Sequence, residues 1–162
     1  MKNYVRRCIM ILTLGIALMS WGLVYASSGG GSVETPKNPD IEKANQAIKE
    51  KNWDQAVLLL KTALSHDENN AEIFNLLGYS ERNRGNLDDA FKYYDRALAL
   101  DPKHRGAHEY IGEAYLMTGN LAKAEEQLAI LDKLCFLPCE EYRELKSAIA
   151  EFKQKKSVSS DY

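Results

Sequence analysis

The sequence predicts an all-α fold built from repeated pairs of helices. Between Ala71 and His104, apolar residues recur at helical spacing in two runs, and Gly85 separates the runs. The same pattern returns 34 residues later, where four landmark positions recur: Gly78 and Gly112, Gly85 and Gly119, Leu87 and Leu121, Ala90 and Ala124. It appears more faintly 34 residues earlier, at Ala44, Ala56 and Ala63. A fixed period of this length indicates a repeat architecture.

Small side chains and turn residues support the pairing of helices. A Gly or Ala at 44, 78 and 112 lets the two helices of a hairpin approach closely, and Ala90 and Ala124 do the same from the opposite helix. Gly85-Asn86 and Gly119-Asn120 are turn dipeptides, because Gly accepts a positive φ and Asn can cap the next helix. Asp101-Pro102 should end a helix, since Pro lacks the N–H group.

Residues 71–104 resemble a tetratricopeptide repeat. The matching positions are Phe74, Leu77-Gly78, Ala90, Tyr94, Ala97 and Pro102. The match is good over residues 105–134 and degenerate over 37–70, where Glu68 replaces the Pro; the third copy departs late, at Leu131 and Phe136. The resemblance implies a right-handed α-solenoid of three helix-turn-helix repeats, at about 37–70, 71–104 and 105–138, with a C-terminal capping helix.

The N-terminus is different in kind from the repeats. Lys2, Arg6 and Arg7 precede an uncharged apolar run from Ile9 to Tyr25, and Ala26 ends a small-x-Ala pattern typical of a cleavage site. Residues 1–26 are therefore predicted to be a secretory signal peptide, so the protein would be exported, most simply to a periplasm. The alternative is an uncleaved anchor, since the run approaches the ~20 residues that span a bilayer. Residues 27–39, rich in Gly, Ser and Pro, should form a flexible linker.

The charge balance restricts the class of partner. The chain has 162 residues, 21 basic and 23 acidic; without the three bases of the signal segment, the balance is 18 against 23, or −5. A net acidic chain argues against nucleic acid and against anionic membrane surfaces, because phosphate binding needs a basic face. A membrane would be contacted only if the signal segment stays uncleaved.

Seven helices are expected over a repeat domain at 40–154. Their ranges are Asp40–Glu50, Trp53–Ser65, Ala71–Arg84, Leu87–Leu100, Arg105–Thr118, Leu121–Leu134 and, as the cap, Glu140–Lys153. Asn70 and Asn120 are candidate N-caps. The last helix has apolar residues at three- and four-residue spacing on one face and charges on the other, which suits a solvating cap. Residues 155–162 should be a disordered polar tail.

Two cysteines remain after removal of the signal segment, Cys135 and Cys139, with Pro138 between them. In an oxidising compartment so close a pair tends to oxidise, which predicts a structural disulfide that fixes the cap to the last repeat. Closing so short a loop would contribute about 2 kcal/mol. A thiol-redox pair, a soft-metal site and unpaired buried thiols are the alternatives.

Signals for catalysis, cofactors or metals are absent from the sequence. It has no G-x-S-x-G, H-E-x-x-H, Gly-rich phosphate loop or haem attachment motif. His104 and His108 are four apart, but His104 falls in the loop between repeats and His108 in a position that packs between helices. Adjacent acidic pairs such as Asp88-Asp89 are expected to be solvated near helix starts. We therefore expect neither an enzyme nor a metal or cofactor site.

The tetratricopeptide resemblance implies that the first helix of each repeat lines a concave groove for a peptide or partner protein. The positions expected to face this groove are Asn45, Asn75, Tyr79, Arg82, Asn83, Glu109, Glu113 and Leu116, with Ile41, Ile48 and Lys49 in the first repeat. Gly106 and Tyr110 stand where the chaperone-tail members of the family have basic residues, so a terminal carboxylate is not the expected ligand. The predicted function is a non-catalytic interaction module of the cell envelope. The alternatives are a thiol-redox or metal-handling accessory protein using Cys135 and Cys139, and self-association of a short solenoid.

Overall fold

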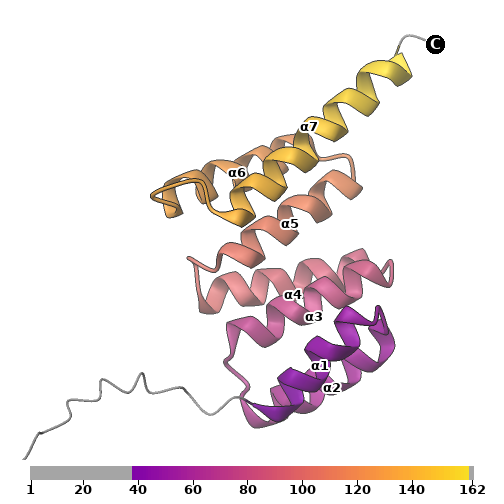
Figure 1. The fold of residues 1–162 in the computed structure, drawn as a ribbon, viewed down its shortest axis with the longest axis vertical. Coiled ribbons are helices and arrows are strands. Elements are labelled where there is room, and N and C mark those ends of the chain that lie inside the picture. The colour runs from indigo at the N-terminus through magenta and orange to yellow at the C-terminus, as the bar shows by residue number, and fades with distance from the viewer. Residues whose placement is uncertain (1–37, 161–162) are drawn as a thin grey trace, which may run out of the picture. The chain divides into compact units, whose positions relative to one another are not determined.

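The computed structural model describes residues 38–160, which belong to one compact unit of the chain, and they form seven α-helices and no strand. The helices are α1 (Pro39–Lys49), α2 (Trp53–His66), α3 (Ala71–Asn83), α4 (Leu87–Leu100), α5 (Arg105–Met117), α6 (Leu121–Leu134) and α7 (Glu140–Ser160) (Figure 1). The predicted signal peptide and most of the predicted linker lie outside the described residues. No helix within 38–160 combines the length and the apolar character needed to cross a membrane.

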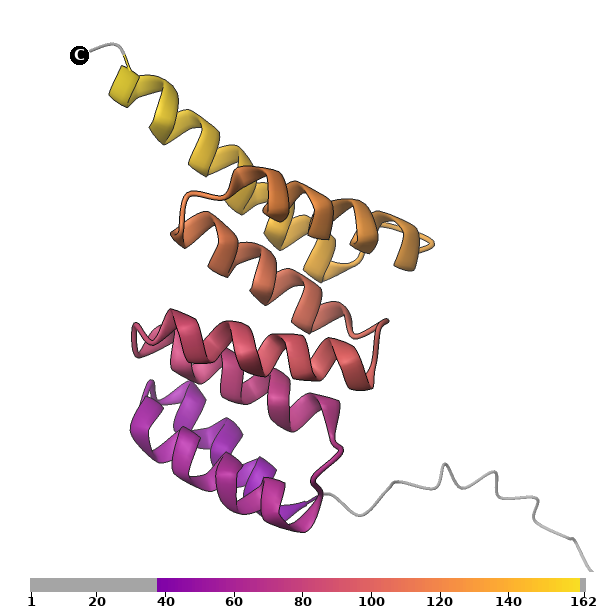
Figure 2. The same ribbon diagram turned by 180° about the vertical axis from the view of Figure 1, so that it is seen from behind.

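The helices pack as antiparallel hairpins stacked in chain order. The pairs α1–α2, α3–α4 and α5–α6 form the hairpins, and α2–α3 and α4–α5 contacts join one hairpin to the next. The second helices of the pairs lie behind in Figure 1 and face the viewer in Figure 2. Helix α7 packs on both α5 and α6, as the first helix of a further repeat would. The predicted helical solenoid with a cap is confirmed.

Helix boundaries agree with the sequence expectation to within one residue for α1 to α6. The exception is α7, which continues past Lys153 to Ser160, so residues 155–160 are helical and not the disordered tail that the sequence analysis expected. The physical reason is local: residues 154–160 contain no Gly or Pro, and Gln154, Lys155 and Lys156 are good helix formers.

Turn and cap residues set these boundaries. The side chains of Asn52, Asn70 and Asn120 each accept a hydrogen bond from a backbone N–H of the helix that follows. The residue two positions before α4 and α6 has a positive φ, 88° at Gly85 and 77° at Gly119. The equivalent residue before α2 is Lys51, whose φ of 56° places a non-glycine residue in the left-handed region.

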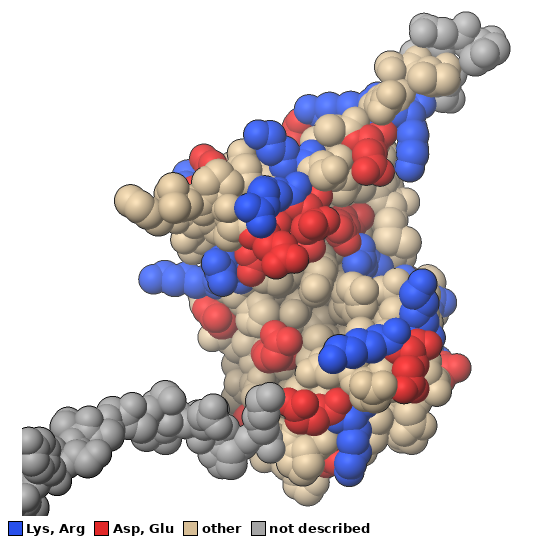
Figure 3. Space-filling model, in the orientation of Figure 1, with Lys and Arg blue, Asp and Glu red and all other residues tan. Residues whose placement is uncertain are grey.

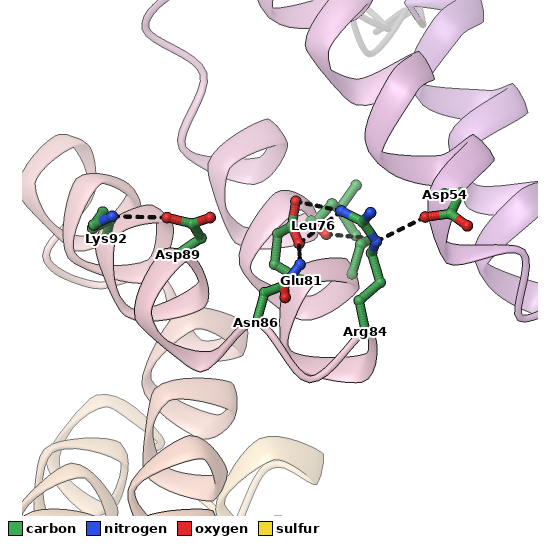
Figure 4. A network of polar contacts seen from close by, with 8 residues as sticks. Asp54, Leu76, Glu81, Arg84, Asn86, Asp89 and Lys92 are labelled. Carbon is green, nitrogen blue, oxygen red and sulfur yellow. Dashed lines mark hydrogen bonds and ion pairs between the residues drawn. The ribbon is translucent and has the colours of Figure 1, made fainter.

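Asn86 is the one predicted capping Asn whose side chain does not cap its helix. Its Nδ2 donates instead to Glu81 Oε2 at 2.7 Å, and Glu81, 3% exposed, also accepts from Arg84 Nη1 at 2.9 Å. Arg84 Nε in turn lies 2.8 Å from Asp54 on α2 (Figure 4). The turn between α3 and α4 is thus tied to the preceding repeat by a polar network around a buried carboxylate.

Close packing at two glycines confirms the importance of small side chains. A Cβ at Gly78 would lie 2.5 Å from the ring of Tyr94, which is fully buried on α4. A Cβ at Gly112 would lie 2.6 Å from Leu145. Leu145 belongs to α7, so the close approach at Gly112 is to the capping helix and not, as the hairpin argument predicted, to its own partner α6.

The link between α6 and α7 carries the two cysteines. In the structure Cys135 and Cys139 form a disulfide, with Cα atoms 5.8 Å apart. Between them, Phe136 and Leu137 are exposed. The covalent link joins the end of α6 to the residue just before α7, where the cap packs on the last repeat.

Candidate partner-binding groove

The predicted groove residues of the second and third repeats occupy matching places on α3 and α5. Asn75, Tyr79 and Arg82 follow one another by four and three residues on α3, and Glu109, Glu113 and Leu116 do the same on α5. That spacing places each trio on one face of its helix. Helices α3 and α5 are in contact, and α7 packs along α5. We call the surface formed by these three helices the groove.

Arg82 is the centre of the groove. Its guanidinium forms a hydrogen-bonded salt bridge with Glu113, and lies 5.3 Å from the ring centroid of Tyr79 and 5.6 Å from that of Tyr110. The two tyrosine rings are 4.8 Å apart, and Trp53 packs edge-on against Tyr79 at 5.9 Å. The Arg82 side chain is only 12% exposed. It therefore joins α3 to α5, and the Tyr79 and Tyr110 rings beside it are partly exposed.

Two pockets open along this surface, at opposite halves of α5. The first, which we call the apolar pocket, has a volume of about 280 Å³. Its apolar side chains are Leu116, Met117, Ala148 and Phe152, with Arg82, Glu113, Glu151 and Lys155 at its polar boundary. Met117 is 56% exposed, which leaves a large apolar side chain accessible at the edge of the pocket.

The second pocket, of about 380 Å³, lies beside the N-terminal half of α5 and is called the acidic pocket. Carboxylates from three helices line it: Glu72 from α3, Glu109 from α5, and Glu140, Glu141 and Glu144 from α7. Asn75, His104, Gly106 and Tyr110 complete the lining. Figure 3 shows the corresponding acidic surface gathered between α5 and the start of α7.

Part of this negative charge is compensated within the protein. His104 Nδ1 accepts a hydrogen bond from the Ala107 N–H, so its Nε2 faces Glu72, 2.9 Å away, and this contact raises the pKa of His104. Glu141 lies 3.4 Å from Arg105 Nε. Within residues 38–160, Glu109, Glu140 and Glu144 form no salt bridge or hydrogen bond through their carboxylates.

Glu109 is the most unusual group in the pocket. It is 8% exposed, and burial, followed by the repulsion of Glu113, Glu141 and Glu144, raises its pKa to about 8. Desolvation and like charge both favour the neutral acid. Arg82 acts in the opposite direction but is already paired with Glu113. The pocket therefore holds a carboxyl group whose ionisation is opposed by its burial and by the negative charges of its neighbours.

Asn75 supplies a second uncompensated polar group. It is 3% exposed, its Nδ2 donates to Glu72 Oε2 at 3.4 Å, and its Oδ1 is buried without a hydrogen-bond partner among the described residues. A buried acceptor left unpaired costs about 1–3 kcal/mol.

The structure brings together most of the predicted groove residues, but not all. Arg82 contacts both Tyr79 and Glu113, and it lines the apolar pocket together with Glu113 and Leu116. The acidic pocket is lined by Asn75 and Glu109. Asn83 is exposed and donates to the Tyr79 carbonyl of its own helix. Asn45, half-buried on α1, lines neither pocket.

Sequence reasoning missed the contribution of α7. Glu144, Ala148, Glu151 and Phe152 line the pockets, 35 residues after Glu109, Glu113, Leu116 and Met117 respectively. This spacing is close to the 34-residue period of the repeats. The sequence could therefore have indicated that the capping helix also contributes residues to the groove. Tyr110 was considered only as the residue that replaces a basic one of the family, and its ring in fact contacts both Tyr79 and Arg82.

The histidines have structural partners. His108 is 5% exposed, and its two ring nitrogens lie 2.7 Å from Gln127 Oε1 and 3.0 Å from the Pro102 carbonyl. This agrees with the expected packing role. Within the part of the chain that the structure describes, no three His, Cys, Asp or Glu side chains are arranged to hold a metal ion.

Two sequence profiles, both of the tetratricopeptide repeat, match residues 41–105 and 82–149, which together span well over half of the chain. The chain belongs to the tetratricopeptide repeat family. The human Protein O-mannosyl-transferase TMTC3 is 30% identical to this chain over 82 residues, and its mouse counterpart is 29% identical over the same length. These segments cover 51% of this chain but only 9% of each relative.

Solved tetratricopeptide structures share the fold. The Sgt2 domain of Aspergillus fumigatus has a TM-score of 0.66 at 19% identity, covering 79% of this chain and 84% of that one. The Yersinia enterocolitica type III secretion chaperone SycD, in complex with a peptide of the translocator YopD, has a TM-score of 0.62 at 22% identity, covering 73% and 92%. The second domain of human RPAP3, in complex with an HSP70 peptide, has a TM-score of 0.61 at 18% identity, covering 70% and 92%.

Proposed function

We propose that this tetratricopeptide repeat protein binds an extended segment of a partner protein along the groove of α3, α5 and α7, without catalysing a reaction on it. The observation that carries the proposal is the pair of pockets, one at each half of α5 and both lined by the same three helices. One pocket is apolar and the other is acidic, so two side chains of different chemistry on one peptide could each occupy a pocket that matches them.

The dimensions of the groove fit an extended chain. Glu109 in the acidic pocket and Leu116 in the apolar pocket are seven residues apart on α5, or about 10 Å along the helix axis. An extended peptide advances about 3.3 Å per residue. Two side chains about three residues apart would therefore reach the two pockets, and the exposed faces of Tyr79 and Tyr110 would lie between them.

The structural neighbours support binding as the general role of this architecture. SycD holds a translocator peptide and RPAP3 an HSP70 peptide in the structures compared above. Because these neighbours are less than 25% identical to this chain, they support the class of ligand and not its identity.

Site-specific photo-crosslinking tests the groove directly. A photoreactive phenylalanine analogue in place of Met117, 56% exposed at the apolar pocket, is expected to give a discrete adduct in an extract of the source cells. The matched control is the same analogue at Leu58, which is 60% exposed on α2 and lines neither pocket.

Equal adducts from both positions, or none from position 117, would contradict binding in the groove. An adduct between two copies of the chain would identify the partner as a second copy. Removal of the Tyr79 ring by Tyr79→Ala should weaken the adduct at 117 while the far-UV circular dichroism stays unchanged, because the ring is half-exposed.

We further propose that the protein works in the cell envelope. The support is the predicted signal peptide at 1–26 and a cysteine pair whose disulfide would persist only outside the reducing cytosol. N-terminal sequencing of the protein from fractionated source cells tests this, with Ser27 expected as the first residue. An intact Met1 in a cytosolic fraction would contradict it.

A further inference from the structure

We propose that the acidic pocket binds an arginine side chain of the partner segment, so that the groove recognises a basic residue about three positions from an apolar one. This inference rests on the proposed function and names the chemistry of one of its two subsites. Helices α3, α5 and α7 converge at this pocket, and each contributes at least one carboxyl group to a cavity of about 380 Å³.

The protein does not neutralise this cavity with its own side chains. Glu72 and Glu141 are paired with His104 and Arg105, but Glu109, Glu140 and Glu144 make no salt bridge within the described residues. Folding thus keeps the two exposed carboxylates of Glu140 and Glu144 and the buried carboxyl group of Glu109 around one space, and a bound cation would favour ionisation of Glu109 and offset the repulsion between these groups.

Two almost fully buried groups show that the pocket is more than a solvated acidic patch. Glu109 is 8% exposed and Asn75 is 3% exposed, and both belong to the wall of the cavity. Among residues 38–160 the Asn75 Oδ1 has no hydrogen-bond partner, while its Nδ2 donates to Glu72. A buried acceptor without a donor, beside carboxyl groups that carry or can take up negative charge, favours a ligand that brings N–H groups.

An arginine side chain meets these requirements better than other cations do. A guanidinium presents five N–H donors in a plane, so it can bridge carboxylates from two helices and still reach a third acceptor. Tyr110 lines the same cavity and offers an aromatic ring on which that plane can stack. A metal ion is disfavoured, because no three ligating side chains in residues 38–160 have suitable geometry.

The space for this side chain is created by Gly106. A Cβ at this position would lie 3.3 Å from Asn75 Nδ2 and 3.6 Å from the His104 ring, so a larger residue would fill the mouth of the cavity between them. Gly106 is in the first turn of α5, where nothing in its backbone requires a glycine, since its φ is not positive.

The test uses small probes and does not depend on finding the partner. The full-length chain is labelled with ¹³C at its glutamate carboxyls and titrated with N-acetyl-arginine amide, with N-acetyl-lysine amide, and with N-acetyl-citrulline amide, the neutral isostere of arginine. We expect saturable shifts at Glu109 and Glu144 with arginine, weaker ones with lysine and none with citrulline.

Variants then localise the site. Glu109→Gln and Glu144→Gln should each weaken arginine binding about tenfold, the effect of losing one charge-assisted contact. Glu126→Gln, an identical charge change on the exposed side of α6, should leave it unaltered. Gly106→Val should abolish the shifts while the helix content is retained.

Three results would overturn the proposal: a response to citrulline equal to that of arginine, lysine binding as tight as arginine, or undiminished binding by the Glu109 and Glu144 variants. None of them bears on crosslinking at position 117, which reports on the apolar pocket. Failure of the arginine subsite and failure of the groove are therefore separate outcomes.

Discussion

Arg82 on α3 and Glu113 on α5 form a salt bridge across two consecutive repeats, and the Arg82 guanidinium also lies over the rings of Tyr79 and Tyr110. From the sequence, Arg82 is expected to face the groove and a bound partner. The structure gives it three intramolecular contacts and leaves 12% of its side chain exposed. Its role in joining the repeats must therefore be separated from any role in binding.

Arg82→Ala is expected to destabilise the fold by about 2–3 kcal/mol, because it leaves the half-buried Glu113 without its partner. Urea denaturation of Arg82→Ala, Glu113→Gln and the double variant measures the coupling. We expect a coupling of at least about 1 kcal/mol. Additive losses would show that the pair contributes nothing beyond its separate packing.

The raised pKa of Glu109 predicts that the protein becomes less stable as pH rises, the reverse of the effect of a carboxyl group whose pKa is lowered by folding. The Glu109 pKa is about 8 in the folded protein and near the ordinary 4.5 when unfolded, so the folded state binds more protons between these values. Stability should therefore fall as pH rises through this window, by about 1–3 kcal/mol. Glu109→Gln should remove most of that slope, and Glu126→Gln should not.

His104 affects the same experiment in the same direction. Its pKa is raised by the hydrogen bond to Glu72, so its stabilising contribution is complete below its unfolded pKa and is lost as pH rises through the folded value. The comparison of Glu109→Gln with the parent chain isolates the carboxyl group. A slope unchanged by that variant would show that Glu109 ionises normally.

Gly78 tests the close packing of α3 on α4. Gly78→Ala would place a methyl group 2.5 Å from the buried Tyr94 ring, and should cost about 1–3 kcal/mol despite the better helix propensity of Ala. Gly106→Ala is the control, since its nearest neighbour is a side-chain nitrogen 3.3 Å away. Equal thermal midpoints for the two variants would mean that the Tyr94 ring moves aside without cost.

Cys135 and Cys139 are predicted to stabilise the cap. The Cys135→Ser/Cys139→Ser variant should lose about 2 kcal/mol, and the loss should be equal to that caused by reducing the parent chain. Thiol titration of the isolated protein distinguishes a structural disulfide from a redox-active cysteine pair. An exposed pair that is reduced easily, with no change in stability, would favour the redox role.

Lys51 offers a stabilising substitution. It has a φ of 56° where the other two repeats have Gly85 and Gly119 with positive φ. Lys51→Gly should raise the free energy of unfolding by about 0.5–1 kcal/mol, since it relieves backbone strain that only glycine avoids. Lys49→Gly, two residues earlier at the last residue of α1, should lower the free energy of unfolding, because glycine is a poor helix former.

The sequence predicted the helices of this protein well because their ends are determined locally. Asn70 and Asn120 cap as expected, Gly85 and Gly119 take the left-handed conformation, and α4 ends just before Asp101-Pro102. The glycine at 78 also predicted the close approach of α3 to α4, because that contact lies within one repeat, and the structure adds that the Tyr94 ring fills the space.

The site depended on contacts that no local pattern encodes. The burial of Glu109 and the convergence of carboxylates require α7 to pack along α5, and the sequence analysis treated that helix only as a cap. Asn86 likewise had the right residue type for a cap, but its amide is held by Glu81, whose burial is a tertiary effect.

The left-handed Lys51 also bears on how the stack comes apart. In a linear array each repeat is held only by its neighbours, and α1 is held chiefly by α2, so the outermost hairpin has the fewest restraints and the least favourable turn. We expect its backbone amides to exchange with deuterium first. Both pockets are assembled from α3, α5 and α7, so the first hairpin could fray and reform while a bound segment stayed in place.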